Sequence, residues 1–214
     1  MKVSVVVLTL LFVSTIVAEN VKALVILPKY FGLNTHLIRE MMDSYGWEVT
    51  LTAVDSTVQP CNYSSSQGSN SYPVDIKISD ITDVTVYDCV VVASSSWLVV
   101  GSTAYMDLKN SPECLELIHN ANEAGLVVSA TCAGMRVLAA ADVINGKHVT
   151  GKAGNGNIFL NEVLAAGGIY DGQNILPVVD GNIVTSTRGQ FYNEQIFNAL
   201  VNALENSRNL RKGK

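Results

Sequence analysis

The sequence predicts a three-layer α/β fold in which a doubly wound, mostly parallel sheet is covered by helices on both faces. Short, continuous apolar runs recur along the chain, as expected of strands that are buried on both sides. Segments with helical periodicity separate these runs, and this alternation is typical of a parallel sheet with crossover helices. With 214 residues, 48% of them hydrophobic, the chain is long enough to bury one full core.

The first half of the chain supplies a strand, a helix and further strands. Residues 21–27 form an apolar run with one lysine, which predicts a buried strand. A helical pattern then follows Asn34 and ends at Gly46, a residue typical of a C-terminal cap. Residues 47–54 alternate and are rich in β-branched side chains, so they predict a second strand. After a loop rich in Ser, Asn and Gly, a short edge strand is expected at 74–78 and a central strand at 84–93.

The second half continues the alternation. Ser111 and Pro112 begin a helix as its cap and first turn, and Gly125 ends it. A buried strand at 126–131 then leads directly into a short helix at 134–141. The remaining elements are expected to be a strand at 147–150, a helix at 158–166, a hairpin of 174–179 with 182–186, and a closing helix at 195–204. We expect a single domain over 19–206 and a solvated basic tail at 207–214.

Residues 1–18 have the pattern of a secretory signal peptide. Lys2 is followed by an uncharged, mostly apolar run over 3–17, and Ala18 provides a small residue at a cleavage position. The sequence therefore predicts a secreted or extracytoplasmic protein that has no membrane contact after cleavage. A retained membrane anchor formed by residues 3–17 and a buried first strand are the alternatives; Ile16, at the −3 position, keeps the anchor open.

Charge and composition argue against several classes of partner. The formal net charge is −5, whereas a nucleic-acid-binding protein usually shows a basic face, so no nucleic acid is expected. Three scattered histidines and the lack of a Cys-x-x-Cys motif predict no metal site. No cofactor is expected. Export would permit disulfides, and four cysteines allow three complete pairings between which the sequence does not choose. If Cys132 stays free, at most one bridge is possible among Cys61, Cys89 and Cys114.

The junction at Cys132 carries the chemistry. A buried strand runs into this cysteine and a helix starts at once, while small residues, Ala130 and Gly134, stand two positions before and after it. This arrangement is typical of a nucleophile elbow, a sharp turn that exposes one side chain above the sheet. A thiol beside a helix N-terminus has a lowered pKa and is a strong nucleophile. The alternative is a small apolar cysteine that is buried at the end of a strand.

The segment Ala130-Thr-Cys-Ala-Gly134 resembles the nucleophile motif of the ThiJ/PfpI (DJ-1/PfpI) superfamily. Residues 22–27 resemble the first strand of that family, and residues 87–92 resemble the strand before its oxyanion loop. Residues 181–189, which include Arg188 and Gly189, resemble its late strand and Ser-Arg-Gly turn. The resemblance covers about residues 21–206 and implies a flavodoxin-like, class I glutamine-amidotransferase-like fold. It also implies a homodimer.

The resemblance implies a site around Cys132 in which this chain departs from the family pattern. The family places a glutamate near the start of its first helix, where this chain has Asn34 as a candidate site residue, whose amide can donate a hydrogen bond to the thiolate but exchanges no proton. A helix N-cap is the simpler role for Asn34. A histidine often follows the cysteine or the later Val-Thr strand, whereas Ala133 and Lys152 stand there. Ser95 replaces a glycine of the oxyanion loop but keeps its backbone N–H. His36, His119 and His148 are the remaining histidines, and we regard His36 as a candidate base.

Two functions follow from these departures. In the first, Cys132 attacks a small-molecule carbonyl substrate, and the N–H groups of Ala133 and Ser95 hold the oxyanion, with Gly134, Arg188 and Gly189 lining the pocket. The resemblance then implies hydrolase, glyoxalase or deglycase-like chemistry. In the second, the chain is a non-catalytic family member, in which Cys132 senses oxidants or contacts a bound ligand. The loss of the usual glutamate, histidine and glycine pair favours the second.

Overall fold

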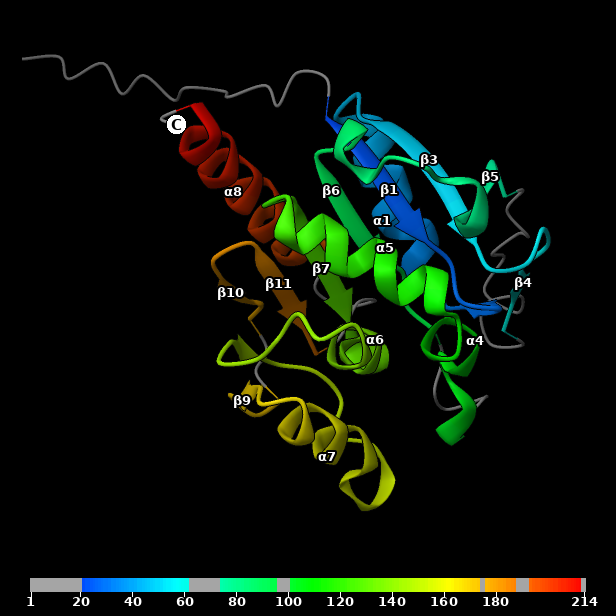
Figure 1. The fold of residues 1–214 in the computed structure, drawn as a ribbon, viewed down its shortest axis with the longest axis vertical. Helices are drawn as coiled ribbons and strands as arrows, with labels where there is room; N and C mark the ends of the chain where they lie inside the picture. The colour runs from blue at the N-terminus through cyan, green and yellow to red at the C-terminus, as the bar shows by residue number, and fades with distance from the viewer. Residues whose placement is uncertain (1–20, 62–73, 96–100, 174–175, 188–192, 213–214) are drawn as a thin grey trace, which may run out of the picture.

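A computed structural model describes residues 21–61, 74–95, 101–173, 176–187 and 193–212 (Figure 1). These residues form a seven-stranded sheet in the order β10-β11-β7-β6-β1-β3-β5, in which only the edge strand β10 is antiparallel to its neighbour. The fold class predicted from the sequence is therefore confirmed. The sheet strands are β1 (Lys22–Ile26), β3 (Glu48–Ala53), β5 (Ile76–Lys77), β6 (Cys89–Val92), β7 (Val127–Thr131), β10 (Val178–Asp180) and β11 (Ile183–Ser186).

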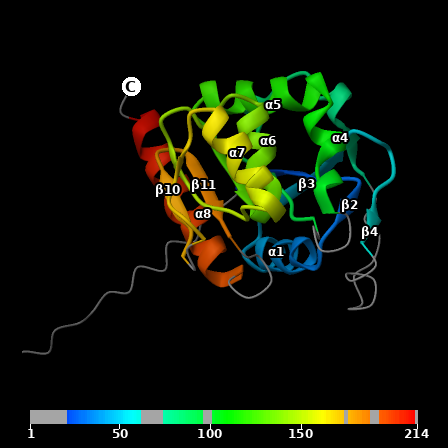
Figure 2. The same cartoon turned by 90° about the horizontal axis from the view of Figure 1, so that it is seen from below.

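Helices cover both faces of the sheet, as the view from below shows (Figure 2). One face packs against α1 (Leu33–Ser44) and α8 (Asn193–Lys212). The other face packs against α5 (Pro112–Glu123) and α6 (Met135–Ala140), with the short helix α4 (Met106–Lys109) alongside. This pair of covered faces explains why the strands are continuous apolar runs instead of alternating ones.

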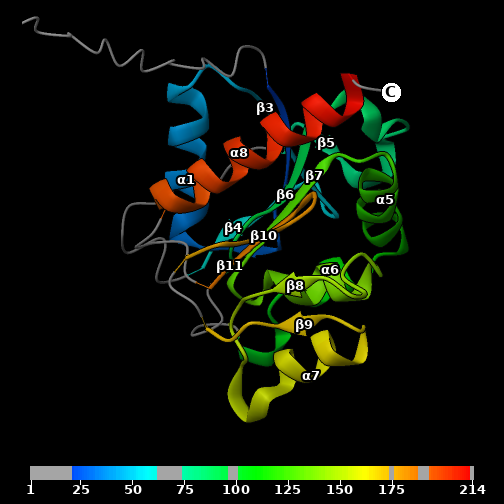
Figure 3. The ribbon, with the colours of Figure 1, turned by 90° about the vertical axis from the view of Figure 1, so that its left-hand side faces the viewer.

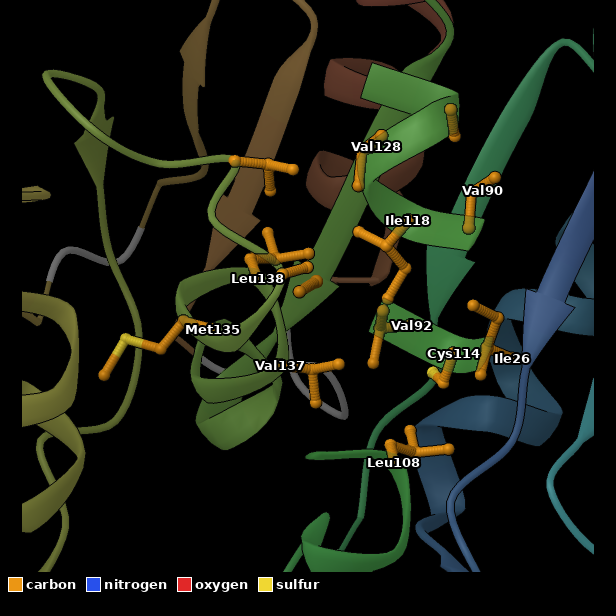
Figure 4. Packing of buried hydrophobic residues seen from close by; sticks show 14 of the residues in the cluster. Ile26, Val90, Val92, Leu108, Cys114, Ile118, Val128, Met135, Val137 and Leu138 are labelled. Atoms are coloured by element: carbon orange, nitrogen blue, oxygen red, sulfur yellow. The ribbon is translucent and has the colours of Figure 1, made fainter. Parts of the chain in front are cut away.

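The core therefore consists of two clusters that the sheet separates. Leu24 and Ile26 of β1 lie in the cluster under α5, whereas Val25 lies in the cluster under α1 and α8. The same alternation sends neighbouring residues of β6 and β7 to opposite faces. Figure 4 shows the first cluster, in which side chains of α5 and α6 meet the strands; the labelled residues are Ile26, Val90, Val92, Leu108, Cys114, Ile118, Val128, Met135, Val137 and Leu138.

A smaller unit lies beyond the carboxyl end of β7 (Figure 3). It contains the parallel pair of β8 (His148–Val149) with β9 (Ile169–Tyr170), and the helix α7 (Ile158–Ala165). Another short parallel pair joins β2 (Tyr30–Phe31) to β4 (Gln59–Pro60). The short strand expected at 147–150 is present as β8, whereas β2, β4 and β9 were not expected, because two-residue strands are too short to show a period in the sequence.

Three expectations from the sequence need correction. The strand expected at 84–93 is shorter, because Val84–Val86 forms a 3₁₀ turn that is capped by Asp83, whose side chain accepts a 2.8 Å hydrogen bond from the Thr85 amide. The strand expected at 74–78 is limited to β5 in the same way, since a 3₁₀ turn starts at Ile78. The closing helix does not end at 204: α8 extends to Lys212, so the expected boundary at 206 falls inside a helix.

Candidate functional site

Cys132 lies at the turn between β7 and α6. β7 ends at Thr131, and a single 3₁₀ turn, Cys132–Gly134, leads into α6. The backbone of Cys132 has a φ of 61°, a left-handed conformation that residues with a side chain rarely adopt. Such a conformation costs about 1–3 kcal/mol, so the surrounding structure must hold it in place. Cys132 is partly exposed, and the turn presents it at the carboxyl edge of the sheet.

The loop after β8 braces this turn from one side. The amide of Lys152 donates a 3.2 Å hydrogen bond to the carbonyl oxygen of Cys132. Gly151 sits so close that a Cβ atom placed on it would lie 2.6 Å from the same oxygen and 2.4 Å from Sδ of Met135. Lys152, which stands where the family resemblance led us to expect a histidine, therefore meets the elbow through its backbone.

The segment after β6 forms the other side of the site. The carbonyl oxygen of Ser94 accepts hydrogen bonds from the Gly32 amide at 2.7 Å and from the Thr35 hydroxyl at 3.2 Å. These contacts bring the start of α1 to the carboxyl end of β6. The amide of Ser95, our candidate oxyanion donor, donates a 2.8 Å hydrogen bond to the hydroxyl of Tyr105.

Tyr105 is a residue of the site that the sequence analysis missed. Its side chain is fully buried, and its own φ is 67°, a second left-handed residue close to the elbow. The hydroxyl also donates to the carbonyl oxygen of Thr131 at 3.4 Å. Burial raises the pKa of Tyr105 well above its ordinary value, and the negative charge of the Cys132 thiolate raises it further. Tyrosine in a stretch of small residues gives no sequence signal for such a contact.

Arg136 of α6 holds the Tyr105 segment in place. Its guanidinium donates to the carbonyl oxygens of Ser102 at 3.0 Å and Ala104 at 2.9 Å. The same group pairs with Glu162 of α7 at 2.7 Å and lies over the ring of Phe159, with 4.3 Å between the guanidinium carbon and the ring centroid. Arg136 is 2% exposed, so these partners compensate a buried charge.

The structure places the other candidate residues as follows. Asn34 is the second residue of α1, whose N-cap is Gly32, so the expected N-cap role for Asn34 is wrong. His36 lies on the first turns of the same helix, with Nε2 3.2 Å from the Glu40 carboxylate. His148 pairs with Asp171 at 2.8 Å on the exposed β8–β9 unit. Arg188 and Gly189 lie outside the described residues.

All four cysteines belong to the described part of the chain, and no disulfide joins any of them. Cys89 and Cys114 are buried in the two core clusters on opposite faces of the sheet. Burial raises the pKa of the Cys114 thiol to about 12 and raises that of Cys89 as well. Cys61 is also buried, so Cys132 is the most accessible of the four.

Two further properties concern the described residues alone. Among them, no group of three or more His, Cys, Asp or Glu side chains is arranged to hold a metal ion. No helix within the same ranges combines the length and apolar character that crossing a bilayer requires.

A cysteine on a strained strand-to-helix turn, at the carboxyl edge of a parallel sheet, defines a class of α/β proteins with a nucleophile elbow. A family model described as "DJ-1/PfpI family" matches residues 21–199 of this chain. The chain therefore belongs to the DJ-1/PfpI family. The resemblance inferred from Ala130 to Gly134 and from the segments 22–27, 87–92 and 181–189 is thus confirmed, and the match spans every strand of the main sheet.

Individual relatives are distant. An uncharacterized protein of Archaeoglobus fulgidus is 27% identical over 104 residues, which are 49% of this chain and 58% of that protein. A two-domain protein of Anabaena variabilis with DJ-1/ThiJ/PfpI-like and ferritin-like domains is 22% identical, with a TM-score of 0.64 over 78% of this chain; the match spans only 45% of that protein. The chain thus spans about half the length of these two relatives, 58% of the first and 45% of the second.

Two solved structures match over nearly their whole length. A ThiJ/PfpI domain protein of Brachyspira murdochii is 18% identical with a TM-score of 0.70, and the match covers 86% of this chain and 96% of that one. Drosophila melanogaster DJ-1beta is 18% identical with a TM-score of 0.63, covering 91% and 97%. At this level of identity the likeness concerns the fold.

Proposed function

We propose that this chain is a reactive-cysteine member of the family, whose Cys132 thiolate attacks the carbonyl carbon of a small aldehyde or ketone. The observation that carries the proposal is the left-handed, partly exposed backbone of Cys132 at the end of β7. A conformation that costs free energy persists only where its surroundings enforce it, and such positions cluster at functional sites. The bracing contacts of Gly151 and Lys152 supply that enforcement.

The proposed step is addition. A sulfur–carbon bond forms, the π electrons of the carbonyl group move to oxygen, and a proton from solvent water then neutralises that oxygen to give a hemithioacetal. The amide of Ala133, at the start of the turn toward α6, supports the developing charge, and the Ser95 amide supports it once the ligand oxygen replaces the Tyr105 hydroxyl as acceptor. A hydrolase, glyoxalase or deglycase-like reaction would continue from this adduct.

The test compares the purified protein with its Cys132→Ser variant. We expect the wild type to consume methylglyoxal and the variant to lose this turnover, because a serine hydroxyl is a far weaker nucleophile than a thiolate. A Cys61→Ala variant removes a buried thiol elsewhere and should keep the activity. Equal turnover by wild type and Cys132→Ser, or none by either, would contradict the proposal.

The hydrogen bond from Ser95 to Tyr105 favours a second function, a redox-sensing thiol. An amide that already has an acceptor is a poorer oxyanion donor, whereas oxidation of a thiolate to the sulfenic and sulfinic states needs no oxyanion hole. Peroxide treatment followed by intact mass would then add oxygen atoms to Cys132 and none to the Cys132→Ser variant, without any turnover of carbonyl compounds.

We also propose that the chain is exported after cleavage behind Ala18 and that it forms a homodimer. Support for export is the charged, apolar and small-residue pattern of residues 1–18, and support for the dimer is the family resemblance. The N-terminal sequence and sedimentation mass of protein recovered from its native source would check both.

A further inference from the structure

We infer that Tyr105 is a positioning residue for Cys132, whose hydroxyl ties the Ser95 amide to the cysteine-bearing strand and supplies a hydrogen bond that favours the thiolate. The inference deepens the proposed function and rests on it in one respect, that Cys132 is the reactive group. It holds equally whether the thiolate attacks a carbonyl compound or reacts with an oxidant, because both require the ionised sulfur.

The elbow is shaped around the tyrosine ring. A Cβ atom on Gly134 would lie 3.5 Å from the Tyr105 hydroxyl oxygen, 3.6 Å from a ring carbon and 3.4 Å from the Cβ of Ala130. Gly134, one of the two small residues that flank Cys132 in the sequence, thus stands against the tyrosine. The hydroxyl lies between the Ser95 amide, 2.8 Å away, and the Thr131 carbonyl oxygen, 3.4 Å away. It therefore bridges the ends of β6 and β7, directly before the cysteine.

The tyrosine is held in this place by groups on the elbow helix itself. Arg136, four residues after Cys132, binds the carbonyl oxygens of Ser102 and Ala104, which stand three residues and one residue before Tyr105. This grip supports the left-handed backbone of Tyr105, whose φ is 67°. Tyr105 and Cys132 both have left-handed backbones, which cost free energy and persist only where the surrounding structure holds them. We infer that the same structure fixes the Tyr105 hydroxyl relative to the Cys132 sulfur.

The hydroxyl is a lasting donor. It accepts from the Ser95 amide, and its own proton is directed only weakly, at 3.4 Å, toward Thr131. Because Thr131 directly precedes Cys132, we infer that rotation about the C–O bond redirects that proton toward the ionised sulfur of Cys132. Burial, the charge of Cys132 and the carboxylate of Asp107 raise the pKa of Tyr105, while the Ser95 amide and Arg136 act in the opposite sense. The Tyr105 hydroxyl therefore keeps its proton near neutral pH and acts toward the thiolate as a hydrogen-bond donor, not as a base.

This role compensates for the residue that the chain lacks at the start of α1. Asn34 stands where the family resemblance leads us to expect a glutamate, and an amide exchanges no proton with a thiol. In the inferred arrangement the Tyr105 hydroxyl, carried by the segment before α4, supplies a hydrogen bond from a different element of the fold. The thiolate is then stabilised without a general base.

The experiment measures the rate at which iodoacetamide alkylates Cys132 as a function of pH, with mass spectrometry to assign the label. We expect Tyr105→Phe to move the midpoint upward by about one pH unit, so that alkylation at neutral pH slows roughly tenfold. Tyr170→Phe is the matched control, because its hydroxyl donates 2.7 Å to the Gly151 carbonyl oxygen on the other side of the elbow. This control should keep the wild-type midpoint.

An unchanged midpoint in folded Tyr105→Phe, or equal shifts in both variants, would overturn the inference. Far-ultraviolet circular dichroism establishes that each variant is folded. If Tyr105→Phe does not fold, replacing tyrosine by 3-fluorotyrosine throughout the wild type makes the hydroxyl a stronger donor. The midpoint must then fall, and no change contradicts the role of Tyr105. Alkylation of Cys132 requires no enzymatic turnover. If the proposed carbonyl chemistry fails, the alkylation midpoints therefore still test the role of Tyr105.

Discussion

At the scale of single residues, two glycines near Cys132 differ in what a methyl group would meet. A Cβ atom on Gly151 would lie 2.6 Å from the Cys132 carbonyl oxygen, a separation that side-chain carbons do not tolerate. A Cβ atom on Gly134 would find its neighbours at 3.4 Å or beyond, which is ordinary contact. The backbone of Gly151, and not that of the motif glycine Gly134, therefore requires the absence of a side chain.

We predict that Gly151→Ala destabilises the protein by about 1–3 kcal/mol, because the elbow must shift to admit the methyl group. Gly134→Ala, the matched control, should cost less than about 1 kcal/mol. Urea unfolding of the two variants, followed by circular dichroism, gives both values. Equal losses would show that the two positions are packed alike.

The sequence was informative about Cys132 and silent about Tyr105 for a physical reason. The cysteine is defined by local order, since a buried strand, one residue and a helix follow each other directly in the chain. Tyr105 reaches Ser95 and Thr131 through tertiary contacts that span 10 and 26 residues, and no local pattern records them. Asn34 was assigned to the wrong place in its helix because Gly32, which also favours N-caps, begins the helix first.

At the scale of elements, an ion-pair network joins α6 to α7. Glu162 of α7 accepts from Arg136 at 2.7 Å and 2.8 Å and from Lys109 of the neighbouring α4 at 2.7 Å. Burial on its own would raise the pKa of Glu162, but the hydrogen bonds from Arg136 and Lys109 outweigh it and hold the pKa below its ordinary value. This carboxylate therefore binds a proton less readily in the folded chain than in the unfolded one.

This lowered pKa of Glu162 makes the stability of the folded chain depend on pH. The contribution of Glu162 to stability is complete above its unfolded pKa, about 4.3, and is lost as the pH falls through the lower folded value. We expect Glu162→Gln to be less stable than the wild type at neutral pH and to lose less on acidification below about pH 4.5. Urea unfolding at a series of pH values measures both slopes. Glu116→Gln is the control, because it removes an exposed carboxylate of α5 that lies outside the network. If stability changes with pH in the same way for wild type and Glu162→Gln, Glu162 does not contribute as argued.

Most strands and helices were predictable because a helix buried along one stripe shows a helical period in the sequence, whereas a strand buried on both faces shows a short continuous apolar run. The helix at Ser111 illustrates this, since its cap accepts from the Cys114 amide at 3.2 Å and Pro112 occupies the first turn, as expected. The strand at 84–93 failed because apolar content alone does not separate a strand from the 3₁₀ turn that precedes it.

At the scale of the whole molecule, the end of α8 closes the fold. The Ser207 hydroxyl donates 2.8 Å to the Gly125 carbonyl oxygen, and Arg208 pairs with Asp88 at 3.1 Å. Asp88 in turn accepts from the Lys22 amide at 3.0 Å, at the start of β1. The two described ends of the domain are thus linked through one carboxylate. The tail at 207–214 was expected to be solvated because a cluster of charges usually is. Its first two residues instead contact Gly125 and Asp88, which the sequence of the tail does not reveal.

We predict that a chain ending at residue 206 is less stable than the full chain by about 1–2 kcal/mol, since it loses one partly buried hydrogen bond and one partly exposed ion pair. A chain ending at residue 209 retains Ser207 and Arg208 and should be nearly as stable as the full one. Thermal or urea unfolding of the three chains decides the matter, and equal stability for all of them would contradict the anchoring role.

The distribution of sulfur across the sheet has a practical consequence. With Cys89 and Cys114 sealed beneath opposite helical layers and Cys61 buried at the end of β4, a large thiol reagent meets one group per native molecule and four after denaturation. In a mixed population, the fraction of molecules that carry four labels equals the fraction that is unfolded. A maleimide carrying a polyethylene glycol chain would separate the native and denatured forms as discrete bands on a gel, so the stability of the protein can be measured through its own cysteines.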